Sequence, residues 1–357
     1  MSDNESREAP RYGNYIDGRW QPARSGATFE SRNPSTGELI GTFAASDRDD
    51  VDAAVGAARA AFPAWRATPA PRRGEILYRF GALLAEHKER ISRAMTAEMG
   101  KVIAEARGDV QEGIDIAYLM AGEGRRLFGD TVPSELPDKW AMSVREPLGV
   151  AGLITPWNFP IAIPCWKMMP ALIAGNTVVF KPASDTPWNA VLLVEVLEQA
   201  GFPHGVVNLV TGPGPEVGMP IVRHPGVDVV GFTGNGDTGR AIAVEAADRG
   251  VKLSMELGGK NAIVVLDDAD LDLAVDGIIW SAFGTTGQRC TACSRVIVTD
   301  GVADELVSRL ADRARALTLG FGVDPAIDVG PLINDAAVAK VERYIEIGRD
   351  AGSTLVT

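Results

Sequence analysis

Cys290 is the residue of this chain best suited to covalent chemistry. It lies in the polar segment GTTGQRCTACSR, directly after Arg289, and polar flanks with an adjacent cation favour the nucleophilic thiolate. Cys165, in IAIPCWKMMP, has apolar neighbours and is expected to pack in a core. Cys293 is either a small buried filler or a thiol that pairs with Cys290 under oxidation.

Two polar residues elsewhere suit the steps that a cysteine nucleophile requires. Glu256 stands at the end of the apolar run KLSMEL, before two glycines, and is a candidate general base. The alternative for Glu256 is a surface charge or an ion-pair partner. Asn158, in TPWNF, is a candidate donor to a negatively charged oxygen, or a cap for the turn after Trp157.

Two segments suit a phosphorylated ligand. No acidic residue occurs between Glu146 and Asp185, and Lys181 closes the apolar run TVVFK within that window. The alternative is a core strand with a lysine that reaches solvent. GNGDTG, at 234–239, matches the G-x-G-x-x-G pattern after the run VDVVGF, and glycines there let a pyrophosphate approach the backbone. The alternative is a tight strand-to-helix turn without a ligand.

Short apolar runs from residue 149 onward predict the scaffold for these residues: GVAGLI, TVVFKP, VVNLV, VDVVGF, KLSMEL and NAIVVL. Helical stretches or tight links separate them, and strands that are apolar throughout lie between two layers of helices. The sequence therefore predicts an α/β fold with a doubly wound, mostly parallel sheet that binds its ligand at the carboxyl ends of the strands.

The remaining segments predict further elements. Residues 12–45 indicate a small hairpin region, and apolar periodicity predicts helices over 47–61 and 72–122. A second series begins near Asp270 with a helix to Gly284, the strand SRVIVT, a helix over 303–317 and the start of a strand at STLVT. This series predicts a second, incomplete α/β domain.

Composition limits the class of partner. The 357 residues include 35 Lys and Arg against 47 Asp and Glu, a net charge of −12 that argues against nucleic acid and anionic membranes. The uncharged stretch from Pro147 to Trp166 contains Pro156, Pro160 and Pro164, so we expect a buried strand and a loop rather than a membrane span. Few cysteines, scattered histidines and a polar N-terminus favour a cytoplasmic protein without metal.

Five motifs in order resemble those of the NAD(P)-dependent aldehyde dehydrogenase superfamily: ITPWNFP, GNTVVFKPA, FTG with Gly239, MELGGKN and GQRC. The match extends from IDGRW, at 16–20, to GPLIN, at 330–334. AGEGRRLFGD, at 121–130, is similar to the succinate and 2-oxoglutarate semialdehyde dehydrogenases. The resemblance implies an enzyme that oxidises an aldehyde, expected to be a carboxylated semialdehyde, to the acid with NAD or NADP.

The resemblance also implies roles for residues. Cys290 would be the nucleophile that forms a thiohemiacetal and then a thioester. Asn158 and the backbone N–H of Cys290 would hold the oxyanion, and Glu256 would activate water. Three arginines are candidates for the far carboxylate of the substrate: Arg125, Arg126 and Arg289. The alternative for the first two is a solvated basic turn at a helix end.

The same resemblance implies the cofactor contacts. Ser184 stands where NAD-selective members often carry a glutamate, so we expect NADP to be accepted. The implied contact residues are Thr155, Pro156, Trp157, Lys181, Ala183, Ser184, Gly214, Gly234, Gly239 and Leu257.

Domains and assembly follow from the resemblance as well. It implies a cofactor-binding domain at 1–138 and 159–266, a bridging or oligomerisation segment at 139–158, and a catalytic domain at 267–357. Members form homodimers or homotetramers and continue for about a hundred residues more, so we expect the catalytic domain to be incomplete. Two rivals stay open: a non-catalytic dinucleotide-binding or assembly protein, and an alcohol dehydrogenase built on GNGDTG.

Overall fold

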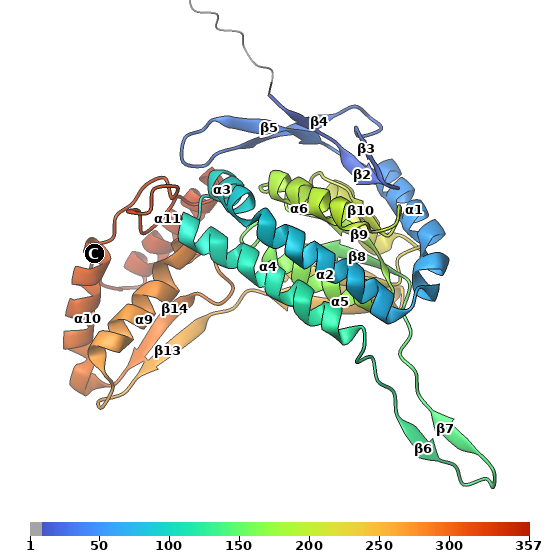
Figure 1. Cartoon of the computed structure of the whole chain (residues 1–357). Coiled ribbons are helices and arrows are strands. Elements are labelled where there is room, and N and C mark those ends of the chain that lie inside the picture. The colour runs from blue at the N-terminus through green and yellow to red at the C-terminus, as the bar shows by residue number, and fades with distance from the viewer. Residues whose placement is uncertain (1–8) are drawn as a thin grey trace, which may run out of the picture. The chain divides into compact units, whose positions relative to one another are not determined.

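The computed structural model describes residues 9–357, which form two compact units (Figure 1). The first comprises the chain up to Ser31 with Leu39–Ile91 and Asp109–Glu256, and the second comprises Arg32–Glu38, Ser92–Gly108 and Leu257–Thr357. By this division residues 139–158 lie in the first unit and residues 257–266 in the second. The functional domains expected from the sequence stay a prediction, because compactness alone assigns no function.

A seven-stranded sheet forms the centre of the first unit, in the order β12-β11-β8-β9-β10-β2-β3. Strands β11, β8, β9 and β10 run parallel, and the hairpin β2–β3 adds an antiparallel edge. Every residue of β8, β9 and β10 is buried, as expected of strands covered on both faces. The strands are β2 Asn14–Ile16, β3 Arg19–Gln21, β8 Val150–Ile154, β9 Thr177–Lys181, β10 Val207–Leu209, β11 Val229–Gly234 and β12 Lys252–Leu257.

Helices cover both faces of this sheet (Figure 1). Helices α1, α7 and α8 share one apolar core with β8, β9 and β11, and α2, α5 and α6 pack together on the other face. The doubly wound arrangement predicted from the sequence is therefore present. The helices are α1 Arg48–Ala67, α2 Ala70–Glu86, α5 Ala162–Ala174, α6 Pro187–Ala200, α7 Met219–Arg223 and α8 Gly236–Asp248, with a short turn η1 at Gly214–Gly218.

Local signals fix where these helices begin and end. The Asp47 carboxylate accepts the backbone N–H groups of Asp49 and Asp50, and Asp50 accepts that of Asp47, so a capping box starts α1. Gly175 ends α5 with a left-handed φ of 98°. A Cβ at Gly175 would lie 3.2 Å from the guanidinium carbon of Arg73, so glycine there also makes room for a buried arginine.

Two smaller sheets complete the first unit. One has the order β1-β5-β4, with β1 Arg11–Tyr12, β4 Thr28–Arg32 and β5 Leu39–Ala44. The other is the antiparallel hairpin of β6 Thr131–Pro133 and β7 Trp140–Met142, which projects from the unit (Figure 1). Every residue of the two hairpin strands is exposed.

The second unit is built on the parallel pair β13 Asn261–Val265 and β14 Cys293–Val298. Helices α9 Leu271–Phe283 and α10 Asp300–Arg315 pack on this pair around Val265, Ile278 and Leu306. A tight turn, η2 Gly284–Gly287, follows α9. Helix α11, Asp335–Asp350, has no buried residue.

Several expectations about elements need refinement. The helical region over 72–122 contains three helices, α2, α3 Lys88–Met99 and α4 Ile103–Glu123, because His87 ends α2 and Gly100 takes a φ of 93° after α3. NAIVVL pairs with SRVIVT instead of joining the large sheet. STLVT forms no strand, since no neighbouring strand supplies a ladder of hydrogen bonds, and α11 was not predicted.

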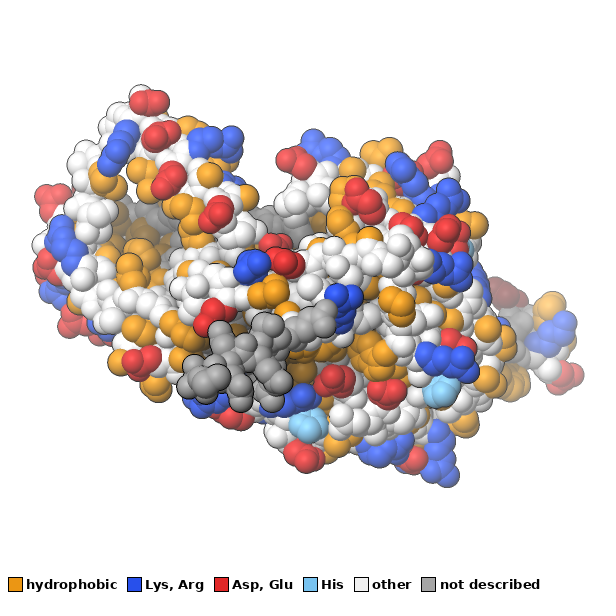
Figure 2. Space-filling view, turned by 90° about the horizontal axis from the view of Figure 1, so that it is seen from above, with side chains coloured by type: hydrophobic (Ala, Val, Ile, Leu, Met, Phe, Trp, Pro, Cys, Tyr) orange, Lys and Arg blue, Asp and Glu red, His pale blue; other side chains and the backbone are white. Residues whose placement is uncertain are grey.

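The uncharged stretch from Pro147 to Trp166 becomes β8, a loop at 155–161 and the start of α5, as expected. Within residues 9–357, no helix has both the length and the apolar character to cross a membrane. Figure 2 shows acidic and basic side chains interspersed over the visible face. The negative net charge is therefore not concentrated in a single acidic patch on that face.

Candidate active site

The carboxyl ends of β8, β9 and β11 bring predicted cofactor residues to one edge of the large sheet. Ile154, the last residue of β8, pairs with Lys181 of β9 on one side and with Phe232 of β11 on the other. The backbone N–H of Thr155 donates to the carbonyl oxygen of Lys181 at 3.1 Å. Thr155 therefore follows β8 next to Lys181 and Gly234, the last residues of the two neighbouring strands, at the edge where parallel sheets bind ligands.

Lys181 is a buried cation at this edge. Its side chain is 3% exposed, and its Nζ donates to the carbonyl oxygen of Pro182 at 2.6 Å. Burial lowers the pKa of Lys181 to about 8, while the charge of Asp185 opposes that shift. The alternative of a lysine that reaches solvent is wrong, and a desolvated ammonium attracts a phosphate more strongly than a solvated one.

Two buried hydroxyls lie at the same edge. Thr155 follows β8 and is 4% exposed, and Thr233 lies near the end of β11 and is 8% exposed. Among residues 9–357, neither Oγ1 atom has a hydrogen-bond partner. Buried polar atoms are ordinarily paired. These hydroxyls therefore fit a site that is completed by a polar ligand, as a dinucleotide would be. Thr233 was not among the residues predicted from the sequence, although it lies within the FTG motif.

Ser184 lies in the loop between β9 and α6, half-buried beside Ala183. Its hydroxyl donates to the carbonyl oxygen of Gly212 at 3.0 Å, which ties this loop to the one after β10. A serine at this position carries no charge. It therefore adds no repulsion against a ribose 2′-phosphate.

The glycine-rich turn ends β11 and begins α8. Asn235 caps the helix, because its Oδ1 accepts the backbone N–H of Thr238 at 2.8 Å. A Cβ at Gly234 would lie 2.5 Å from the Phe232 ring, so a larger residue there would require the ring to move. Gly239 is buried, whereas a Cβ at Gly214, in η1, would meet open space within the described part of the chain.

Two predicted catalytic residues belong to the first unit. Asn158 lies half-buried with Pro156 and Trp157 in the loop that joins β8 to α5. Glu256 lies near the end of β12, an edge strand, and its side chain is exposed. Leu257, the next residue, is also exposed and begins the last stretch of the second unit.

Lys167 is a charged residue near Glu256, and the sequence analysis gave it no role. It lies on α5, and its Nζ donates to the carbonyl oxygen of Phe232 at 3.3 Å. Burial lowers the pKa of Lys167, while the carboxylate of Glu256 raises it. The two charges therefore interact within the first unit. The signal in the sequence was a lysine inside the apolar segment IAIPCWKMMPALIA.

Cys290 belongs to the second unit and is exposed in the turn before β14. Asn261 Nδ2 donates to the carbonyl oxygens of Cys290 at 2.7 Å and of Ala292 at 3.1 Å, a contact that sequence reasoning missed. Cys165 is fully buried, as predicted, and burial raises the pKa of its thiol well above the usual range. Cys293 is 9% exposed and its Sγ donates to the carbonyl oxygen of Arg295, which favours the filler role.

The three candidate substrate arginines differ in their surroundings. The Arg289 guanidinium lies 4.3 Å from the centre of the Trp280 ring and donates to the carbonyl oxygens of Trp280 and Gly284. These contacts hold the Arg289 guanidinium against its own loop, and its role toward the substrate stays a prediction. Arg125 and Arg126 are exposed just after α4, and Arg126 lies 3.6 Å from the Glu123 carboxylate, so Arg125 is the better candidate of these two.

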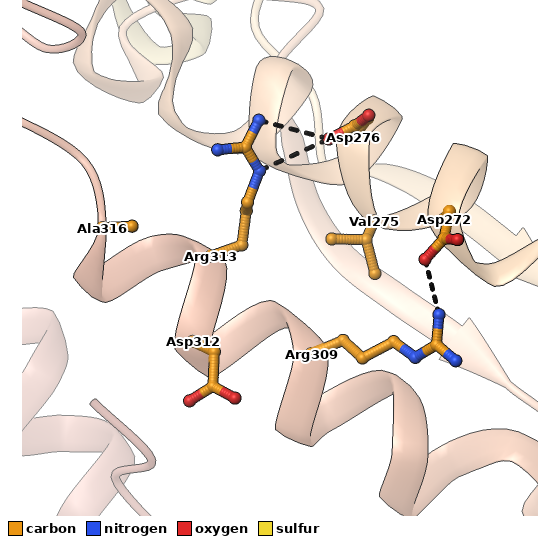
Figure 3. Close-up of a pocket in the computed structure, with 7 residues that line it drawn as sticks. All are labelled: Asp272, Val275, Asp276, Arg309, Asp312, Arg313 and Ala316. Atoms are coloured by element: carbon orange, nitrogen blue, oxygen red, sulfur yellow. Dashed lines mark hydrogen bonds and ion pairs between the residues drawn. The ribbon is translucent and has the colours of Figure 1, made fainter.

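Figure 3 shows a pocket between α9 and α10 in the second unit. Arg309 pairs with Asp272 at 2.5 Å and Arg313 with Asp276 at 3.4 Å, so these charges satisfy one another. No predicted site residue lines this pocket, and we assign it no role. Within the described residues, no three His, Cys, Asp or Glu side chains are grouped to hold a metal ion.

Comparison with known proteins identifies the class of protein to which this chain is similar. The model of the aldehyde dehydrogenase family matches residues 20–357. The α-ketoglutaric semialdehyde dehydrogenase of Bacillus subtilis is 42% identical over 350 residues, which cover 98% of this chain and 72% of that protein. The NADP-dependent succinate-semialdehyde dehydrogenase of Escherichia coli is 41% identical over 341 residues, which cover 96% and 71%.

Solved structures agree with these relatives. A point mutant of betaine aldehyde dehydrogenase from Staphylococcus aureus, in complex with NAD+ and with a BME-modified cysteine, superposes with a TM-score of 0.95 at 35% identity. The match covers 97% of this chain and 70% of that one.

The chain belongs to the aldehyde dehydrogenase family. This membership confirms the predicted fold class and the predicted activity class, the oxidation of aldehydes to acids with NAD or NADP. Neither rival class, the non-catalytic binding protein or the alcohol dehydrogenase, gains support from these relatives.

Proposed function

We propose that this chain oxidises a carboxylated aldehyde to the acid with Cys290 as the nucleophile. The observation that carries the proposal is the contrast among the three free cysteines: Cys290 is exposed on a turn held by Asn261, whereas Cys165 and Cys293 are buried. A nucleophile must reach its substrate, and only an accessible thiol satisfies that need. The BME-modified cysteine of the Staphylococcus aureus relative supports a reactive thiol in this family.

The proposed chemistry divides the reaction among three residues. The Cys290 thiolate attacks the aldehyde carbon, and the Asn158 amide and the Cys290 backbone N–H donate to the oxygen that becomes negative. Bound NAD or NADP supplies the hydride acceptor. Loss of hydride from the thiohemiacetal carbon to that acceptor would leave a thioester on Cys290. Glu256 would then take a proton from the water that attacks the thioester and releases the acid and the Cys290 thiol.

The substrate class follows from the relatives. The relatives from Bacillus subtilis and Escherichia coli are named for α-ketoglutaric and succinate semialdehydes, both of which carry a carboxylate far from the aldehyde. A guanidinium pairs with such a group in two parallel hydrogen bonds. Arg125, exposed just after α4, is the candidate for this contact.

NADP is the cofactor that the first unit suits best, with NAD also accepted. Lys181 offers a desolvated positive charge, Ser184 adds no repulsion, and Thr155 and Thr233 offer unpaired hydroxyls at the same edge. Helix α8 begins at that edge, and helix N-termini stabilise phosphate. We also propose a cytoplasmic location, because the cysteines are free thiols.

The exposed hairpin β6–β7 is the proposed site of self-association into a homodimer or homotetramer. Val132, Trp140 and Met142 on its strands are at least half exposed, at 50%, 62% and 59%. Clustered exposed apolar side chains mark interaction surfaces. The hairpin strands also offer backbone edges that a second chain can pair with.

The substitution Cys290→Ser tests the function. We expect the rate of NADP reduction with succinate semialdehyde to fall by at least about a thousandfold, since serine lacks an accessible anionic form. The affinity for NADP, followed by quenching of tryptophan fluorescence, should remain. Cys293→Ser is the matched control and should retain turnover. Full turnover in the Cys290 variant would refute the proposed nucleophile.

A further inference from the structure

The loop that carries Cys290, residues 284–290, has an unusual backbone. Thr285 and Thr286 lie in the left-handed region, with φ of 51° and 58°. β-Branched residues rarely adopt this region, and such a conformation persists only where its surroundings hold it. Contacts from outside must therefore hold this nucleophile loop in place.

Glu105, in the first turn of α4, makes the central contact. Its carboxylate oxygens accept the backbone N–H of Thr285 at 2.9 Å, and one accepts the Thr285 hydroxyl at 3.0 Å. The same carboxylate lies 3.9 Å from the guanidinium of Arg289, whose side chain is 8% exposed. Glu105 therefore binds both the left-handed start of the loop and the residue before the nucleophile, all within the second unit.

Other contacts act on single points of the loop. Thr286 Oγ1 donates to the carbonyl oxygen of Gly330 at 2.9 Å, and Asn261 Nδ2 donates to that of Cys290 at 2.7 Å. A Cβ at Gly284 would lie 1.7 Å from the Arg289 guanidinium and 2.9 Å from the Glu105 carboxylate. The absence of a side chain at Gly284 is what lets Glu105 and Arg289 approach each other.

We propose that Glu105 is a positioning residue for Cys290. By holding Thr285 and Arg289, its carboxylate fixes the loop so that the thiol and the backbone N–H of Cys290 keep the geometry for attack on the aldehyde. This inference rests on the proposed role of Cys290. It predicts an effect on the chemical step and not on cofactor binding, because the predicted cofactor residues except Leu257 belong to the first unit.

The test compares Glu105→Ala and Glu105→Gln with the wild type. The matched control is Asp115→Asn, an exposed carboxylate on α4 whose Oδ1 accepts from Gln111. We expect Glu105→Ala to lower kcat about ten- to a hundredfold while the Kd for NADP stays within about twofold. Glu105→Gln should keep an intermediate kcat, since its amide oxygen still accepts the Thr285 N–H.

Hydrogen exchange followed by mass spectrometry reads the loop directly. In Glu105→Ala the amides of residues 284–292 should exchange faster, with no change in β13. A wild-type kcat in this variant, unchanged exchange at 284–292, or a loss of cofactor affinity as large as the loss of kcat would each overturn the proposal.

Two further outcomes are also decisive. If Glu105→Ala does not fold, Glu105→Gln decides by the same measurements. If the wild type turns over no aldehyde, the proposed function fails, and the exchange of residues 284–292 alone decides whether Glu105 holds the loop.

Discussion

Lys181, which we propose binds the cofactor, carries a buried charge that destabilises the fold. Burial lowers the pKa of Lys181 from 10.5 to about 8. Between these values the unfolded chain binds the proton more tightly than the native chain, so the free energy of unfolding rises with pH across that window. Because one pKa unit corresponds to about 1.4 kcal/mol, the buried charge destabilises the fold by about 3 kcal/mol at neutral pH.

Replacing Lys181→Met removes this charge and keeps most of the side chain. We expect the free energy of unfolding in urea to rise by about 1 to 3 kcal/mol at pH 7, and this gain to shrink as the pH rises above about 8. Affinity for NADP should fall by at least about tenfold. Lys252→Met, at an exposed position on β12, is the control and should change neither quantity. A less stable Lys181 variant at pH 7 would contradict the argument.

Helix ends in the first unit depend on one buried arginine. From α2, the Arg73 guanidinium donates to the carbonyl oxygen of Ile173 at 3.0 Å, near the end of α5. It also donates to the carbonyl oxygens of Trp65, Arg66 and Thr68, around the end of α1. The last carbonyls of a helix have no partner within the helix. Arg73 therefore joins α2 to the ends of α1 and α5 through hydrogen bonds to their last carbonyl groups.

The substitution Arg73→Leu should lower the free energy of unfolding by about 3 kcal/mol, because the carbonyl groups at the ends of α1 and α5 lose a charged donor. Arg72→Leu is a close control, since Arg72 is 70% exposed and pairs with Glu75 on the surface. We expect it to change the same quantity by less than about 0.5 kcal/mol. Urea unfolding curves measure both, and equal effects would refute the role of Arg73.

At the scale of the whole molecule, the exposed hairpin β6–β7 predicts assembly. The double variant Trp140→Ser, Met142→Ser removes two of its exposed apolar side chains, so we expect a smaller species than the wild type by light scattering after gel filtration. Leu273→Ser, at a 72% exposed position on α9, is the control. An unchanged mass in the hairpin variant would contradict the proposed role of the hairpin in assembly.

Much of the first unit follows from local patterns. The apolar runs at 150–154 and 177–181 are buried parallel strands, because strands covered on both faces need apolar residues throughout. The neighbours of Cys165 and Cys290 distinguished a core thiol from an accessible one. Motif order was sufficient to indicate the family, since each motif is a short contiguous segment.

Only the tertiary structure decided which distant residues meet. Glu105 contacts Thr285 across 180 residues of sequence, and Lys167 lies near the charge of Glu256, with no local pattern in either case. The pairing of NAIVVL with SRVIVT was likewise not predictable, because the apolar pattern of a strand does not determine which strand it pairs with. Periodicity reports which side of an element is buried. The contacts that hold a nucleophile loop depend on where elements far apart in the chain come to lie.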